Sequence, residues 1–156
     1  MTPKLDATFI HPGIFVGSRP PTGDRLRQCA MDRVVLCAAE FQPPEDDFYG
    51  VFVMRCPFHD DYHKRLDPRM LSKIVSTAWG VAMASLRENV LVTCLQGRNR
   101  SALVAVLAMQ ARGVDPAVSV QILRTERPIG CLENPVFEEI ALSGLMKKKR
   151  RSARVA

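Results

Sequence analysis

The chain has 156 residues, of which 47% are hydrophobic and 24% are charged, and these values are typical of one soluble globular domain with a single core. The longest uninterrupted apolar run, Ala102 to Met109, is far shorter than the ~18 residues of a membrane-spanning helix, so we expect no membrane span. The net charge of +6 arises from residues 147–156, which carry six lysines and arginines and no acid, so the rest of the chain is neutral overall.

Two features predict a protein of the reducing cytoplasm. The N-terminal residues, Met1 to Asp6, lack the apolar core of a secretory signal. The five cysteines are odd in number and irregularly spaced, without a Cys-x-x-Cys pair, so that neither a disulfide framework nor a zinc site is expected. Four of them lie in apolar surroundings and are interpreted as small core residues: Cys29, Cys37, Cys56 and Cys131.

The predicted elements alternate between short strands and longer helices. Apolar segments rich in β-branched and aromatic residues predict strands at 8–10, 14–16, 33–37, 51–54 and 90–94. Helices are predicted at 22–30, 68–87, 116–126 and from 135 onward, the last three each starting with an N-cap residue followed by proline. The order predicts a single α/β domain over residues 1–146, followed by a basic tail at 147–156 that we expect to be disordered.

Residues 88–112 carry the clearest functional signal. They form a buried strand, a short loop and a helix that is apolar on nearly every side. The N-terminus of a helix offers unpaired N–H groups and favours an oxyanion. Gly97 permits the tight curvature that turns loop amides inward, and Arg100 adds a planar fork for two phosphate oxygens. The predicted phosphate-binding residues are Leu95, Gln96, Gly97, Arg98, Asn99 and Arg100.

Cys94 makes this phosphate site a candidate catalytic centre. It ends the strand, where its sulfur faces the same concavity as the loop. The helix N-terminus and the nearby arginine favour the thiolate form, which is the nucleophilic form of cysteine. Attack on phosphorus would leave a phosphate on Cys94, stabilised by Arg100 and the loop amides. Ser101 can donate a hydrogen bond to the thiolate when water later releases that phosphate.

The pattern C-x-x-G-x-x-R-S, formed by Cys94, Gly97, Arg100 and Ser101, resembles the signature of the cysteine-based protein tyrosine phosphatases, in their compact dual-specificity branch. The resemblance covers residues 8–142. It implies a central mixed, mostly parallel sheet of about five strands flanked by helices. It also implies hydrolysis of phosphotyrosine, and through a shallow pocket of phosphoserine and phosphothreonine, with no metal or cofactor.

The residue before the cysteine differs from the family pattern, and the position of the family's general acid is ambiguous by one residue. The family usually has histidine before the cysteine, and here Thr93 carries no charge, so activation of Cys94 has to come from the helix and from Arg100. The family's general acid lies on a loop after a strand, which corresponds to residues 56–63. Asp60 aligns best as that acid, but Asp61 is adjacent, and a slip of one residue would exchange them.

Other assignments remain open at the level of sequence. In this family another cysteine can pair with the nucleophile under oxidation. Arg98 either meets the rim of the substrate or is merely exposed, and Asn99 either contacts phosphate or braces the loop. The main functional interpretation is a monomeric phosphatase acting on phosphorylated proteins. The alternatives are an RNA 5′-phosphatase that holds nucleic acid through the basic tail, and a phosphate-binding module without turnover.

Overall fold

The computed structural model describes residues 4–147, and its elements follow the predicted alternation of strands and helices. In chain order they are β1 (Thr8–His11), β2 (Ile14–Gly17), α1 (Gly23–Gln28), β3 (Arg33–Ala38), the 3-10 helix η1 (Glu45–Phe48), β4 (Phe52–Phe58), α2 (Pro68–Ala84), β5 (Val90–Thr93), α3 (Arg100–Ala111), α4 (Pro116–Glu126) and α5 (Pro135–Leu142). The basic tail lies outside the described residues, apart from Lys147.

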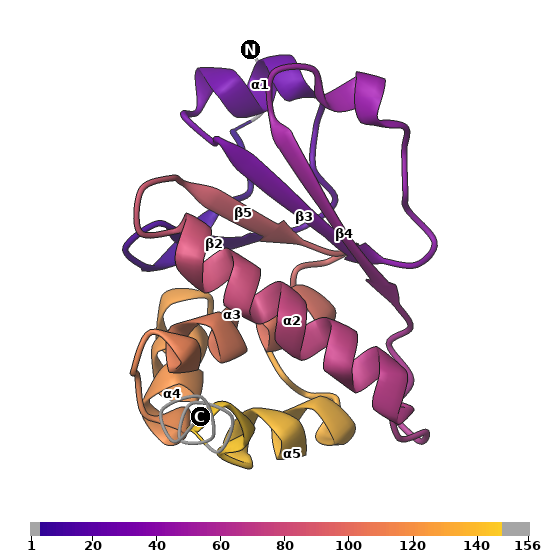
Figure 1. The fold of residues 1–156 in the computed structure, drawn as a ribbon, viewed down its shortest axis with the longest axis vertical. Coiled ribbons are helices and arrows are strands. Elements are labelled where there is room, and N and C mark those ends of the chain that lie inside the picture. Colours follow the sequence, from indigo (N-terminus) through magenta and orange to yellow (C-terminus); the bar gives the residue numbers. More distant parts are fainter. Residues whose placement is uncertain (1–3, 148–156) are drawn as a thin grey trace, which may run out of the picture.

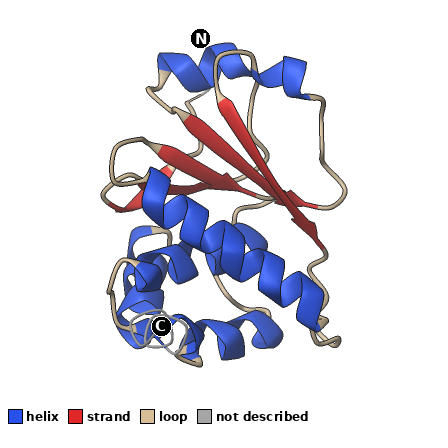
Figure 2. Cartoon of the chain, viewed as in Figure 1, coloured by secondary structure: helices blue, strands red, loops and turns tan. Residues whose placement is uncertain are grey.

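The strands form one sheet in the order β1-β2-β5-β3-β4 (Figure 2). β1 is antiparallel to β2, and the pairs β2–β5, β5–β3 and β3–β4 are parallel. The predicted α/β domain with a mixed, mostly parallel sheet is thereby confirmed. Because the four parallel strands run in one direction, their carboxyl ends meet at one edge of the sheet, with β5 between its neighbours β2 and β3.

Helices cover both faces of the sheet, and its inner strands are buried on both sides. Helices α2 to α5 cover one face, and α1 with η1 covers the other (Figure 1). Side chains alternate between the faces along β3, where Val35 and Cys37 join the larger core and Val34 and Leu36 join the smaller one. This burial on both sides explains why the inner strands are continuous apolar runs. Within the described range no helix is both long and apolar enough to span a membrane.

The helix α3 is the central helix of the larger core. All of its residues are buried, which agrees with its lack of a polar face in the sequence. Its start is therefore held by packing on every side. At the other helix starts, the N-cap side chains of Asp67 and Asn134 accept hydrogen bonds from backbone N–H groups as predicted, whereas Asp115 makes no such bond.

Some boundaries differ from the predicted ones. The strand β4 continues to Phe58 instead of ending at Met54, although it contains Pro57. This is tolerated because β4 lies at the edge of the sheet, where a missing N–H need not pair with another strand. Helix α2 ends at Ala84, three residues earlier than predicted, and α1 is shorter than the predicted 22–30. The 3-10 helix at Glu45–Phe48 was not predicted.

Candidate active site

The carboxyl edge of the sheet brings three chemically important segments together. Cys94 follows β5, Glu40 lies two residues after β3, and Asp60 lies two residues after β4. Because these strands are neighbours in the order β5-β3-β4, the three side chains come from adjacent positions along one edge. Ligands of open α/β sheets bind at this edge.

The sulfur of Cys94 lies inside the loop that follows it. The Cys94 side chain is buried, the Gly97 N–H donates to its Sγ at 3.2 Å, and Ser101 Oγ lies 3.2 Å from the same sulfur. Gly97 has φ of +66°, a left-handed conformation that favours glycine and agrees with the predicted curvature of the loop. Hydrogen-bond donors at the sulfur stabilise a negative charge there.

Arg100 begins α3 and points its guanidinium group at the same edge. Its side chain is buried, and Nη1 donates to Glu40 Oε2 at 2.7 Å and to the Phe58 carbonyl at 3.0 Å, while Nη2 donates to Glu40 Oε1. Among the described residues, no atom accepts a hydrogen bond from the buried Nε. Glu40 therefore fixes the fork of Arg100, and the N–H of Nε and the second N–H of Nη2 remain for an anion.

Replacing Glu40 by glutamine is expected to remove part of the acid sensitivity of the fold. The hydrogen bonds from Arg100 lower the pKa of Glu40 from its ordinary 4.5 to about 2. Between these values the unfolded chain binds the proton and the folded chain does not, so the ion pair stabilises the fold above about pH 4.5 and is lost as the pH falls toward 2. The difference in melting temperature between wild type and Glu40→Gln should shrink when the pH is lowered from 6 to 3.

A matched control for this prediction is Glu45→Gln, which alters an exposed carboxylate on η1. We expect its melting temperature to follow that of the wild type over the same pH range. A difference between wild type and Glu40→Gln that stays constant with pH would contradict the assignment of the ion pair.

Asp60 and Asp61, which the sequence left as alternatives, lie in different surroundings. Asp60 lines a cavity of about 160 Å³ whose other lining residues are Cys94, Leu95, Gln96, Arg98, Asn99 and Arg100. Asp61 lines a different cavity, next to Phe58 and Lys64, and its Oδ1 accepts from the His63 N–H in a local turn. The geometry therefore favours Asp60 as the acid of the site.

Two asparagines hold the Asp60 carboxylate over the loop. Asn99 Nδ2 donates to Asp60 Oδ2 at 3.0 Å, and Asn134 Nδ2 donates to Asp60 Oδ1 at 2.7 Å. Asn99 also donates to the Tyr62 hydroxyl and accepts from the Asn134 N–H. Asn99 thus braces the loop against the segment that carries Asp60.

Arg98 and Thr93 have structural contacts of their own. The Arg98 Nε donates to the Ile129 carbonyl at 2.9 Å, and Nη1 donates to Gln96 Oε1. This side chain therefore lines the cavity with its orientation restrained by two hydrogen bonds. The buried Thr93 hydroxyl donates to the Val35 carbonyl at 2.7 Å. Thr93 is therefore engaged with the neighbouring strand and not with the sulfur of Cys94.

Three of the other cysteines are core residues, as predicted. Cys37, Cys56 and Cys131 are buried, and burial raises the pKa of each thiol. Cys29 differs from the prediction because it lies at the end of α1, where it is partly exposed.

Three residues of the site were not identified from the sequence. Glu40 follows the predicted strand at 33–37. Its position after a buried strand could have indicated a functional residue, because ligands of α/β sheets bind at the carboxyl ends of the strands. Asn134 was recognised only as a helix N-cap, whereas it also binds Asp60. Arg127 was given no role from the sequence, yet it is buried and donates to the loop at the carbonyl of Gly97.

Comparisons with known proteins bear on the fold that carries this site. No protein-family model matches the chain, and no curated protein matches it significantly in sequence. Among solved structures, a mouse putative dual specificity phosphatase complexed with zinc tungstate aligns with a TM-score of 0.79 and 21% identity, over 98% of this chain and 94% of that chain. Human DUSP28 aligns with a TM-score of 0.72 and 23% identity, over 90% and 99%.

The active form of Tk-PTP aligns with a TM-score of 0.69 and 26% identity, over 91% of this chain and 97% of that chain. These alignments span almost the whole of each protein. They confirm the resemblance noted from the sequence, because the chain has the fold of the compact dual-specificity and tyrosine phosphatases.

Proposed function

We propose that the protein is a cysteine-dependent phosphatase that hydrolyses phosphate monoesters through a phosphate bound covalently to Cys94. The observation that carries this proposal is one cavity lined by a nucleophilic sulfur, a carboxylate and a buried arginine, namely Cys94, Asp60 and Arg100. The phosphatases of the same fold support it. A phosphate-binding module without turnover would need neither the sulfur nor the carboxylate.

In the first step the Cys94 thiolate attacks phosphorus, and the bond between phosphorus and the ester oxygen breaks. Asp60, in its protonated form, gives its proton to the departing oxygen. Arg100 and the inward N–H groups of the loop stabilise the equatorial phosphate oxygens as the charge redistributes. The products of this step are the free alcohol and a phosphate ester of the Cys94 sulfur.

In the second step a water molecule attacks the same phosphorus. The Asp60 carboxylate takes a proton from that water, and the bond between phosphorus and sulfur breaks. Inorganic phosphate leaves, and the sulfur returns to its thiolate form, which the Ser101 hydroxyl at 3.2 Å is positioned to stabilise. No cofactor takes part in either step.

The substrates that fit this proposal best are phosphorylated proteins carrying phosphotyrosine, with phosphoserine and phosphothreonine as further substrates. The names of the structural relatives, which include dual-specificity and tyrosine phosphatases, support this class. In the described part of the chain, no observation favours an RNA 5′-phosphatase over this class.

The test is hydrolysis of p-nitrophenyl phosphate, followed by phosphotyrosine and phosphoserine peptides, in a buffer that contains EDTA. We expect phosphate release that vanadate inhibits competitively, because vanadate imitates the five-coordinate phosphorus of the transition state. Phosphate release no faster than that of a heat-inactivated sample would refute the proposed function.

A further inference from the structure

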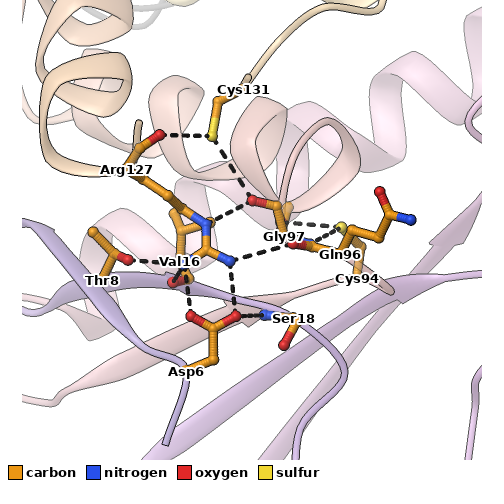
Figure 3. Close-up of polar contacts among 10 residues, drawn as sticks. Asp6, Thr8, Val16, Ser18, Cys94, Gln96, Gly97, Arg127 and Cys131 are labelled. Atoms are coloured by element: carbon orange, nitrogen blue, oxygen red, sulfur yellow. Dashed lines mark hydrogen bonds and ion pairs between the residues drawn. The ribbon is translucent and has the colours of Figure 1, made fainter. Parts of the chain in front are cut away.

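A buried arginine lies behind the phosphate loop and takes no part in the chemistry described above. Arg127 caps the end of α4, and its side chain is 5% exposed. Its guanidinium is surrounded by three segments that are far apart in the sequence: the residues just before and within β1, the end of β2, and the loop after β5 (Figure 3).

The contacts of Arg127 with the loop are made with backbone carbonyls. Arg127 Nε donates to the Gly97 carbonyl at 2.8 Å, and Nη2 donates to the Gln96 carbonyl at 3.3 Å. Glycine is required at position 97 for this approach, because a Cβ there would lie 2.5 Å from Arg127 Nη2 and 2.6 Å from the Gly17 carbonyl oxygen. The loop is thus packed directly on the guanidinium.

The planarity of the peptide bond links these outer contacts to the inner face of the loop. In a trans peptide the C=O and the following N–H point in opposite directions. The Gln96 carbonyl points to Arg127, and the N–H of Gly97, in the same peptide plane, points to Cys94 Sγ. By the same geometry, the Gly97 carbonyl on Arg127 turns the N–H of Arg98 toward the anion side.

Arg127 is itself held in place by Asp6. The two carboxylate oxygens accept from Nη1 and Nη2, each at 2.8 Å, and Asp6 Oδ2 also accepts from the Ser18 N–H at 3.1 Å. A buried guanidinium without a counter-charge is strongly unfavourable, so Asp6 is needed to keep Arg127 in this position. The hydrogen bond from Arg127 lowers the pKa of Asp6 to about 2, and the pair therefore stays charged at neutral pH.

We propose that Arg127 and Asp6 are positioning residues of the phosphate loop: their ion pair holds the carbonyls of Gln96 and Gly97 outward, so that the attached N–H groups face the phosphate. This inference rests on the proposed function, because it concerns the same loop. It assigns a role in oxyanion binding to Asp6, which is 121 positions away from Arg127 in the sequence.

The test compares Asp6→Asn and Arg127→Lys with Glu88→Gln as the matched control. Glu88 forms a two-pronged ion pair with Arg33, which lies at the start of β3 and thus at the opposite end of the sheet. The measurements are the dissociation constant for tungstate by calorimetry, the KM and kcat for p-nitrophenyl phosphate, and the melting temperature.

We expect the dissociation constant for tungstate and the KM for p-nitrophenyl phosphate each to rise about tenfold in both variants. The reason is that a misaligned loop loses charge-assisted hydrogen bonds to the oxyanion. The control should lose thermal stability without a change in tungstate affinity. If Asp6→Asn and Arg127→Lys lower the melting temperature but keep tungstate affinity within twofold of the wild type, the role is purely structural and the inference is wrong.

The tungstate affinities decide the role of the ion pair even if one variant does not fold or the protein has no phosphatase activity. The Asp6 side chain is 47% exposed, so Asp6→Asn decides the question even if Arg127→Lys does not fold. Oxyanion binding does not require turnover. A wild type that binds tungstate but releases no phosphate would refute the proposed function, and the tungstate affinities of the variants would still decide the inference about the ion pair.

Discussion

Replacing Cys94 by serine is expected to lower phosphate release from p-nitrophenyl phosphate by about 10⁴-fold or more. A serine hydroxyl at this position would have to lose its proton before attack. The contacts described for the sulfur are the Gly97 N–H, which donates to it, and the Ser101 hydroxyl, and neither is a base. A loss of rate of this size is expected when the nucleophile is removed and the other groups of the site remain in place.

The control for this substitution is Cys29→Ser, which makes the same chemical change at the partly exposed end of α1. It should retain the activity of the wild type. The Cys94→Ser variant should still bind tungstate, since Arg100 and the loop amides are unchanged. Residual activity within tenfold of the wild type would show that Cys94 is not the nucleophile.

Replacing Asp60 by asparagine is expected to lower kcat on a phosphoserine peptide by about 10² to 10⁴-fold, the range typical of a lost general acid. Serine is a poor leaving group and needs a proton as its bond to phosphorus breaks. The loss on p-nitrophenyl phosphate should be much smaller, because nitrophenolate leaves without full protonation. Asp61→Asn should change either rate by only a few fold, since Asp61 lines a different cavity.

The dependence on leaving group separates the chemical role of Asp60 from a structural one. Asp60 accepts hydrogen bonds from Asn99 and Asn134, so Asp60→Asn also disturbs the contact between its segment and the phosphate loop. A structural disturbance would reduce the rates on both substrates alike. Equal losses on the two substrates, or a larger loss for Asp61→Asn, would refute Asp60 as the general acid.

The parts of the site that could be predicted from the sequence are those that are contiguous in the chain. The segment from the end of β5 to the first turn of α3 contains them all: Cys94, Gly97, Arg100 and Ser101. The local periodicity of the sequence identifies both the strand and the helix. The positive φ of Gly97 and the contacts of Ser101 with the sulfur agree with the roles expected from that pattern.

The sequence favoured Asp60 as the acid through its alignment with the family pattern, but a slip of one residue would have exchanged it with Asp61. Adjacent side chains in an irregular segment point in different directions, and local patterns do not determine which one faces the loop. The choice depends on Asn99 and Asn134, which come from two other segments and bind Asp60 at both of its oxygens.

By itself, then, the sequence determined the fold class, the phosphate loop and the candidate nucleophile, because these depend on short-range hydrogen bonding and on the alternation of apolar residues. Only the tertiary structure decided which groups support the loop. Glu40 is 60 residues from Arg100, and Asp6 is 121 residues from Arg127. Glu40 and Arg100 meet because the parallel strands β3 and β5 bring their carboxyl ends to one edge of the sheet. Asp6 reaches the same edge because the antiparallel strand β1 begins beside the end of β2, and Arg127 reaches it from the end of α4. In both pairs a buried charge requires a partner that no local pattern specifies.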